Sequence, residues 1–193
     1  RAWNAVGPWV TPDHAPRVLH TQSIQTSGPK ALAHKFPPPE KLDYYENLFV
    51  FAWQEKDGVC QTDSWIDLTS KLKGSGDLEW QVPKGQWRIV LYGSYVHHKA
   101  QRGKLLETDP LNKAAMDVHF QHTVVPAVKG LEKHLGKKFT HVHIDSGEIG
   151  NPDWTPKFRE EFRRLRGYDP FPYFAAKAEF VVNNTETTER FLE

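Results

Sequence analysis

Hydrophobic and polar residues follow three different patterns along the chain. Residues 44–100 alternate with a period of two, in aromatic and β-branched runs that Gly and Pro interrupt. This pattern is typical of antiparallel strands. The first 43 residues are rich in Pro and weakly periodic, whereas the residues after the β-rich part change to a helical period. The sequence therefore predicts an extended segment at 1–43, a β-rich insert at 44–100 and an α/β region at 101–193.

Individual strands can be placed in the first two segments. Alternation over 17–25 predicts a strand that Gly28–Pro29 should end. An apolar run at 48–53 predicts a second strand, and two runs joined by a turn at Pro83–Gly85 predict a hairpin over 78–92.

A long helix is expected after the β-rich insert. Thr108 or Asp109 can cap it, with Pro110 at its first position and Gly136 at its end, and Pro126 should kink it. Apolar residues at steps of three or four predict its buried face. They are Met116, Phe120, Val124, Val128, Leu131 and Leu135.

A short strand over 139–144 follows, and then a polar loop that ends at Gly150. A second helix is predicted over 156–166, with Thr155 as its cap and Gly167 as its stop. A third begins after Asn183, which forms a capping-box pattern with Glu186. Helix, strand, loop and helix in this order are typical of an α/β unit.

The polar loop holds the strongest candidates for chemistry. In α/β folds, functional groups collect where a strand ends and a loop begins. Asp145 and Glu148 lie at that point, and Trp154 follows Glu148 by six residues. A carboxyl group in this position suits acid–base catalysis on a sugar. The plainer interpretation is an Asp that caps a turn and a solvated Glu. The loop lacks the dense acid spacing of a calcium loop.

Two histidines precede this loop on the predicted strand. His141 and His143 lie two residues apart, in phase with Asp145, so all three should share one face. They could form part of a zinc site, but ordinary hydrogen bonds or contacts to substrate hydroxyls are the more frequent use of such histidines.

Composition narrows the classes of partner. Lys and Arg total 25 and Asp and Glu total 24, so the formal net charge is only +1 and does not favour binding to nucleic acid or to an anionic membrane. The single cysteine excludes a disulfide framework within the chain, and no apolar run is long enough to cross a bilayer. The 7 Trp residues are typical of sugar-binding proteins, because an apolar sugar face stacks on an aromatic ring, and equally of all-β cores.

This excess of aromatic residues supports an alternative function. Trp65, Trp80 and Trp87 could present their rings to a glycan, in which case the chain would be a non-catalytic carbohydrate-binding module. Alternation argues against part of this hypothesis, since Trp80 shares the parity of Leu78 and Val82 and should face a core.

The stretch from His143 to Tyr173 resembles glycoside hydrolase family 106, the α-L-rhamnosidases. The shared pattern is an Ile-Asp-Ser-x-Glu-x-Gly loop, then Asn, Trp-Thr-Pro-x-Phe, and Arg-Gly-Tyr-Asp-Pro with a Tyr three positions on. Three earlier stretches agree in order. They are Gly7–Asp13, the β-rich residues 68–87, and Glu107–Asp109 with the helix after it.

The resemblance implies a fold of α/β plus β type, in which part of a (β/α)8 barrel carries an antiparallel β-sandwich-like insert. It also implies inverting hydrolysis of terminal α-L-rhamnosides of complex glycans, with a calcium ion near the sugar. Glu148 takes the place of one of two catalytic carboxylates. We expect Asp145, His143, Asn151 and Trp154 to bind the substrate.

Two features depart from a complete family site. Gly147 stands where the family usually has an aromatic residue, so one wall of the pocket should be missing. An inverting site also needs a partner carboxylate roughly 6.5–9.5 Å away, which the resemblance assigns to a later strand, beyond Glu193. We therefore interpret the chain as part of a longer enzyme. Its expected partners are a carbohydrate substrate and the rest of the parent polypeptide.

Overall fold

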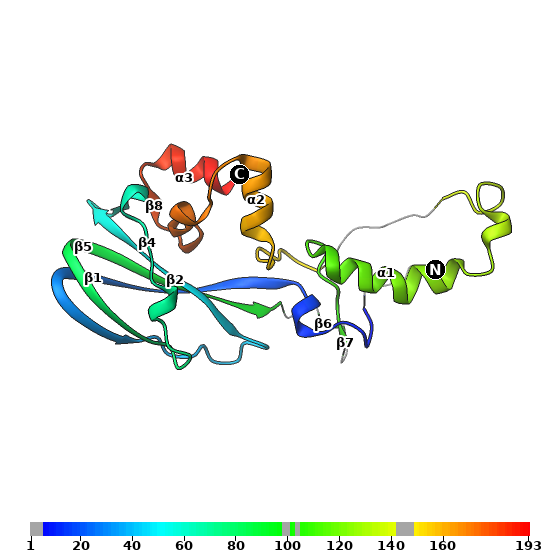
Figure 1. Cartoon of the computed structure of the whole chain (residues 1–193), viewed down its shortest axis with the longest axis horizontal. Coiled ribbons are helices and arrows are strands. Elements are labelled where there is room, and N and C mark those ends of the chain that lie inside the picture. The colour runs from blue at the N-terminus through cyan, green and yellow to red at the C-terminus, as the bar shows by residue number, and fades with distance from the viewer. Residues whose placement is uncertain (1–5, 98–100, 103–104, 142–148) are drawn as a thin grey trace. The chain divides into compact units, whose positions relative to one another are not determined.

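The structure is a computed structural model that describes residues 6–97, 101–102, 105–141 and 149–193 (Figure 1). It divides into two compact units. Unit 1 comprises Arg1–Val18 and Tyr95–Pro156, and unit 2 comprises Leu19–Ser94 and Lys157–Glu193.

These units do not coincide with the three predicted segments. Residues 19–43 belong with the β-rich insert instead of with a separate N-terminal segment, because β1 joins its sheet. Residues 157–193 also belong to unit 2, so the predicted α/β region 101–193 is split between the units.

Strands dominate unit 2. Its sheet has the order β1-β5-β2-β3-β8, with β4 paired to β2. The strands are β1 (Arg17–Lys35), β2 (Glu46–Lys56), β3 (Val59–Cys60), β4 (Ile66–Asp67), β5 (Asp77–Val96) and β8 (Val181–Val182). The helical elements of this unit are η2 (Thr62–Ser64), η3 (Thr69–Lys71), α2 (Phe158–Arg166), η6 (Phe171–Ala178) and α3 (Thr185–Leu192).

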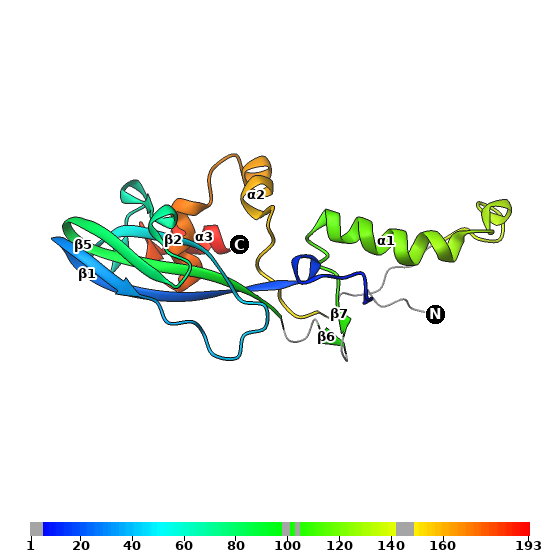
Figure 2. The same cartoon turned by 60° about the horizontal axis from the view of Figure 1, so that its bottom comes forward.

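The two long ribbons β1 and β5 fold back on themselves at the same end of the sheet (Figures 1 and 2). The rings of Trp80 and Trp87 in β5 have centroids 5.3 Å apart, whereas a straight strand would separate these residues by about 23 Å. Gly85, at φ +121°, lies in this bend. The predicted hairpin is therefore present, within a strand that runs unbroken from Asp77 to Val96.

β1 turns in the same way at Gly28, where the sequence predicts that the strand ends. The side-chain amide of Gln22 donates to the carbonyl oxygen of Pro37 at 2.9 Å, which brings the two arms together. A Cβ on Gly28 would lie 2.1 Å from the oxygen of Pro83, so glycine is required where the two bends meet. The predicted stop is therefore a turn, and the strand continues to Lys35.

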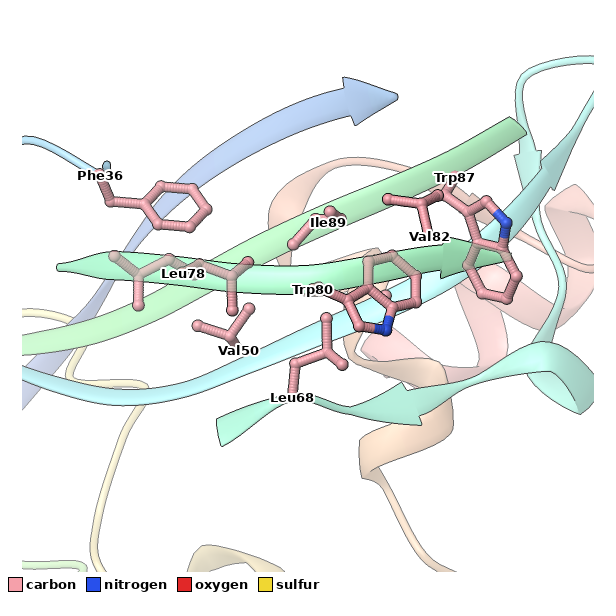
Figure 3. Packing of buried hydrophobic residues seen from close by; sticks show 10 residues of the cluster. Phe36, Val50, Leu68, Leu78, Trp80, Val82, Trp87 and Ile89 are labelled. Atoms are coloured by element: carbon pink, nitrogen blue, oxygen red, sulfur yellow. The ribbon is translucent and has the colours of Figure 1, made fainter. Parts of the chain in front are cut away.

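The hydrophobic core lies between the folded-back arm of β5 and the strands below it (Figure 3). Its ten members are drawn mainly from alternate positions of β2 and β5, as a period of two requires, together with one residue after β1 and one after β4. They are Phe36, Val50, Ala52, Leu68, Leu78, Trp80, Val82, Trp87, Ile89 and Leu91. Trp80 and Trp87 are 8% and 5% exposed, so the expectation that Trp80 faces a core is confirmed. These two rings are not presented to a glycan.

An aromatic cluster covers the opposite face of β2. Phe49 and Phe51 stack with their centroids 4.7 Å apart, and both pack against Phe171 of η6. The indole nitrogen of Trp53 donates to the oxygen of Pro172 at 2.7 Å, and the Tyr92 hydroxyl donates to the oxygen of Phe174 at 2.7 Å. Both faces of β2 are therefore buried, which explains its unbroken apolar run.

The expected portion of a (β/α)8 barrel is not shown by the described residues. Such a barrel consists of parallel strands that alternate with helices. Here the sheet is open, β2 pairs antiparallel with β3, β4 and β5, and the parallel pairing of β3 with β8 spans two residues. The antiparallel strands predicted within 44–100 are confirmed.

Unit 1 contains η1 (Pro12–His14), the pair β6 (Gln101–Arg102) and β7 (Leu105–Leu106), α1 (Lys113–Val128) and η5 (Glu132–His134). The cap of α1 is Asn112, whose side chain accepts from the amides of Ala114 and Ala115. The predicted caps Thr108 and Asp109 are wrong, and so is the end at Gly136. Pro126 lies inside α1 near its last turn.

The predicted buried face of α1 is also wrong. Met116 and Phe120 are 37% and 49% exposed, whereas Ala115 and His119, one position earlier, are buried. His119 turns inward because its ring approaches that of Trp9, with centroids 6.3 Å apart.

The last two helices agree with the sequence in extent but not in their caps. α2 begins at Phe158 after Lys157, not Thr155, and ends at Gly167, where φ is +79°. α3 is capped by Asn184, which accepts from the amide of Thr187 at 2.7 Å. Asn183 instead bonds with Thr62. Within the described ranges, no helix has both the length and the apolar character needed to cross a membrane.

Candidate functional site

The central residues of the predicted site, His143, Asp145 and Glu148, lie outside the described residues. The last described residue before them is His141. It is exposed, and its Nδ1 atom shares a hydrogen bond of 2.8 Å with the Thr140 hydroxyl. Neither Thr140 nor His141 is in a strand, and Phe139 forms only an isolated bridge. The described part of the predicted strand 139–144 is therefore not a strand.

The other side of the loop, from Ile149 to Thr155, is held firmly within unit 1. The amides of Asp153 and Trp154 donate to the oxygen of Arg17 at 3.1 and 3.3 Å. Gly150 has φ +86°, and a Cβ there would lie 2.8 Å from the ring of His97. A side chain at this position would therefore displace the loop.

The two described candidates for substrate binding differ in exposure. Asn151 is exposed, so its amide is accessible to a ligand. Trp154 is 7% exposed and forms an isolated bridge with Arg17. In this arrangement Asn151 can contact a sugar directly, whereas Trp154 holds the loop through its packing.

Unit 1 also contains a set of buried polar residues that the sequence did not single out as a site. Glu107, Thr108 and Asp109 directly follow β7, and each is at most 3% exposed. Arg17, at 5% exposed, is buried in the same unit. The available signal was the Glu-x-Asp stretch that contributed to the family resemblance.

Asp109 connects three parts of unit 1. Its amide donates to the oxygen of His14 at 2.7 Å, and its carboxylate accepts from the amide of Leu111 at 2.9 Å. The Thr155 hydroxyl lies beside this carboxyl group but does not reach hydrogen-bond geometry. Burial raises the pKa of Asp109, against the opposing effects of Leu111 and Thr155. Asp109 thus supports the start of α1 and the end of the loop together.

The Gly-Pro-Trp stretch near the N-terminus has a packing role in the same unit. A Cβ on Gly7 would lie 2.2 Å from the ring of Trp9, so only glycine lets this ring fold back. On the other side the ring stacks on His122, with centroids 5.0 Å apart and an interplanar angle of 13°. Burial lowers the pKa of the neighbouring His119, which favours its neutral form.

Much of the motif that follows Trp154 is also structural. Arg159 forms a two-pronged ion pair with Asp169, with distances of 3.1 and 2.5 Å, and its guanidinium lies 4.3 Å from the centre of the Phe171 ring. Asp169 also accepts from the amide of Phe171. These contacts join α2 to η6 and belong to unit 2.

Across 6–97, 101–102, 105–141 and 149–193, no three side chains of His, Cys, Asp or Glu converge in a way that could hold a metal ion. Within those ranges His141 belongs to no such group, and the calcium ion implied by the resemblance stays a prediction.

Three comparisons connect this geometry with known proteins. A protein from Formosa agariphila named "Putative beta-glucuronidase" is 31% identical over 223 aligned residues, which cover 96% of this chain and 19% of that protein. The solved structure of a rhamnosidase from Novosphingobium sp. PP1Y superposes with a TM-score of 0.79 at 17% identity and covers 98% of this chain and 35% of that one. The chain thus spans a fifth to a third of the proteins it matches.

The family comparison is more specific than either similarity. The family model described as alpha-L-rhamnosidase, glycoside hydrolase family 106, matches residues 40–193. This range contains the loop with Asp145 and Glu148, the segment from Ile149 to Thr155 and the Arg159–Asp169 pair. The chain belongs to the alpha-L-rhamnosidase family of glycoside hydrolases.

Proposed function

We propose that this chain is the part of an inverting α-L-rhamnosidase that supplies Glu148 as one of its two catalytic carboxylates. The family match over residues 40–193 carries this proposal, because it includes the loop in which Glu148 follows Asp145. The substrate would be a terminal α-L-rhamnoside of a complex glycan.

The described flank of the loop supports this role. Ile149, directly after Glu148, is buried, and the amides of Asp153 and Trp154 are tied to Arg17. A catalytic side chain needs such a fixed backbone support, because displacement by a fraction of an ångström already slows proton transfer. Asn151 is exposed on the same segment, where it would bind a sugar hydroxyl, as we propose for His143 and Asp145.

In an inverting reaction the two carboxyl groups have different roles. One protonates the glycosidic oxygen as the bond to the anomeric carbon breaks, and the other takes a proton from the water that attacks the opposite face. We assign one of these roles to Glu148, and the second carboxylate to a part of the polypeptide beyond Glu193. The calcium ion implied by the resemblance would need oxygen ligands, for which Asp145 is a candidate, and no step of the reaction is assigned to it.

The test is Glu148→Gln in the complete polypeptide that contains this chain. The substitution preserves size and hydrogen bonding but removes proton exchange, so kcat on an aryl α-L-rhamnoside should fall by about 10²–10⁴-fold with a smaller change in KM. The matched control is Glu161→Gln. Glu161 pairs with Arg164 on an exposed face of α2, with its side chain 54% exposed, and should leave kcat within about twofold.

Substrate class and stereochemistry need separate measurements, since one relative is named a glucuronidase. An aryl β-D-glucuronide should be turned over at least about tenfold more slowly than the rhamnoside, given that a misfit of one group costs about 1–3 kcal/mol. NMR of the first product should show the β-anomer of rhamnose. Full activity of Glu148→Gln, or release of the α-anomer first, would contradict the proposal.

A further inference from the structure

Unit 2 contains a cleft that belongs neither to the loop of Glu148 nor to unit 1. Its volume is about 470 Å³, within the range of ligand-binding pockets. The lining comes from three parts of unit 2: the connector after β1 at Phe36–Pro38, the start of β2 at Tyr45–Leu48, and the segment from Thr69 to Gly76. We refer to it as the β2 cleft.

Hydrogen bonds fix the walls of the β2 cleft. The amide of Phe36 donates to the oxygen of Gly76 at 3.0 Å, and the amide of Gly76 donates to the oxygen of Lys73 at 2.8 Å. The amide of Val50 donates to the Thr69 hydroxyl at 3.2 Å. Gly76 has φ +87°, and a Cβ there would lie 2.5 Å from the Phe36 oxygen. The cleft is therefore preformed, which reduces the entropy lost when a ligand binds.

Tyr45 provides a fixed aromatic wall. Its hydroxyl donates to the side-chain oxygen of Asn47 at 2.8 Å, and its ring meets that of His20 edge-on, with centroids 5.9 Å apart. A Cβ on Gly93 would lie 2.3 Å from the Tyr45 hydroxyl, so the ring packs directly on this glycine. Together with Pro37 and Pro38, the ring gives the cleft a rigid apolar surface.

The polar groups of the cleft are mixed donors and acceptors. The Tyr45 oxygen can still accept a bond, and the Ser75 hydroxyl donates to Asp77 and keeps its lone pairs. In the part of the chain that the structure describes, the Asn47 amide nitrogen has no acceptor. Such a mixture suits sugar hydroxyls, each of which both donates and accepts.

Charge argues against an anionic ligand. Lys73 is the cation that lines the cleft, and its ammonium is 2.7 Å from the carboxylate of Glu79. A phosphate or a uronic acid would need cationic partners that are not already paired.

We propose that the β2 cleft is a second, non-catalytic carbohydrate site that holds a neutral sugar with its apolar face on Tyr45. The inference uses the membership of the chain in a glycoside hydrolase family and does not depend on the role of Glu148. It also differs from the binding module considered from the sequence, since the rings of Trp80 and Trp87 lie in the core.

The experiment is an NMR titration of the ¹⁵N-labelled chain with methyl α-L-rhamnoside, and in parallel with methyl β-D-glucuronide. The amides of Asn47, Thr69 and Ser75 should shift saturably with the rhamnoside, with a Kd of about 1–10 mM. The glucuronide should bind at least about threefold more weakly, because Lys73 is already paired with Glu79 and the carboxylate of the ligand would lack a cationic partner in the cleft.

Variants at two neighbouring tyrosines separate ring stacking from general effects. Tyr45→Ala should weaken binding about tenfold, whereas Tyr45→Phe keeps the ring and should stay within about threefold. Tyr44→Ala is the matched control, since Tyr44 is 54% exposed and does not line the cleft. If Tyr45→Ala perturbs the whole spectrum, Ser75→Ala at an exposed position gives an independent test and should weaken binding at least about threefold.

Three results would overturn the proposal. The first is the absence of shifts at about 50 mM rhamnoside. The second is shifts confined to unit 1, for example at Asn151. The third is equal binding by the Tyr45→Ala and original chains. Glu148→Gln should leave the titration unchanged, and a loss of binding in that variant would move the site to the catalytic loop and refute the β2 cleft.

Discussion

The hydrogen bond between Tyr92 and η6 offers a sharp test of how unit 2 is held together. Tyr92 is fully buried, and its hydroxyl donates to the oxygen of Phe174 at 2.7 Å. Tyr92→Phe removes one oxygen atom and leaves the ring among Phe49, Phe51 and Phe174. The substitution therefore isolates one bond between the sheet and the helical segment on it.

The expected cost at pH 7 follows from the burial of both partners. A typical hydrogen bond contributes about 0.5–1.5 kcal/mol, and a buried carbonyl left without its partner costs more. We expect Tyr92→Phe to lower the free energy of unfolding by about 1–2 kcal/mol. Urea denaturation followed by tryptophan fluorescence measures this difference, and the slope with urea should not change.

A second observable comes from the phenol itself. Burial raises the pKa of Tyr92 well above 10. The folded protein keeps this proton above pH 10 while the unfolded chain releases it, so the original protein loses stability as pH rises and the Phe variant does not. At pH 11 the difference between the two proteins should shrink by about 1.4 kcal/mol. Burial also raises the pKa of Cys60, to about 12, but both proteins share this effect.

The control is Tyr44→Phe, at a side chain that is 54% exposed, which should change stability by less than about 0.5 kcal/mol. Equal stability of the original and Tyr92→Phe proteins at pH 7 would show that η6 is not held by this bond. A difference between them that stays constant from pH 7 to 11 would refute the buried phenol.

Two further changes test other joints of unit 2. Gly76→Ala should cost about 2–3 kcal/mol in urea denaturation and abolish sugar-induced shifts in the β2 cleft, because of its φ of +87° and the nearby Phe36 oxygen. Gly74→Ala, with open space around its Cβ, should be near neutral, and equal costs of the two substitutions would contradict the fixed wall of the cleft. Burial would raise the pKa of Asp169, but the bonds from Arg159 and the Phe171 amide outweigh it and the pKa is lowered. This stabilisation is present above the unfolded pKa of 3.8 and is lost as pH falls through the lower folded value. Asp169→Asn should therefore cost about 1 kcal/mol at pH 7 and progressively less as pH falls below 3.8, and a pH-independent cost would refute the ion pair.

Local patterns in the sequence predict part of this fold well. The period of two over 44–100 identifies antiparallel strands, and the parity of Trp80 places its ring in the core. Gly167 marks the end of α2, because a positive φ after a helix favours glycine. Each of these features depends on residues near one another in the chain.

Features that depend on distant contacts were not predictable in this way. Gly28–Pro29 is a turn within β1 instead of its end, since the second arm packs on a bend of β5 more than 50 residues away. The buried side of α1 is set by Trp9, over 100 residues earlier, which selects His119 over Phe120. For the candidate site, the sequence singled out Asn151 and Trp154, but not the buried Asp109 that supports the segment after them.

The attachment of η6 to β2 and β5 has a consequence for how the protein folds during synthesis. The bond from Trp53 to Pro172 joins residues 119 positions apart, and the whole of 95–156 in unit 1 lies between the two segments of unit 2. At about 5–20 residues per second, the ribosome adds the covering segment roughly 6–24 s after β2. Throughout that interval the aromatic face of Phe49 and Phe51 lacks its native cover. Folding of unit 2 should therefore be slow and prone to aggregation at this step, as is general for domains whose key contacts are remote in sequence.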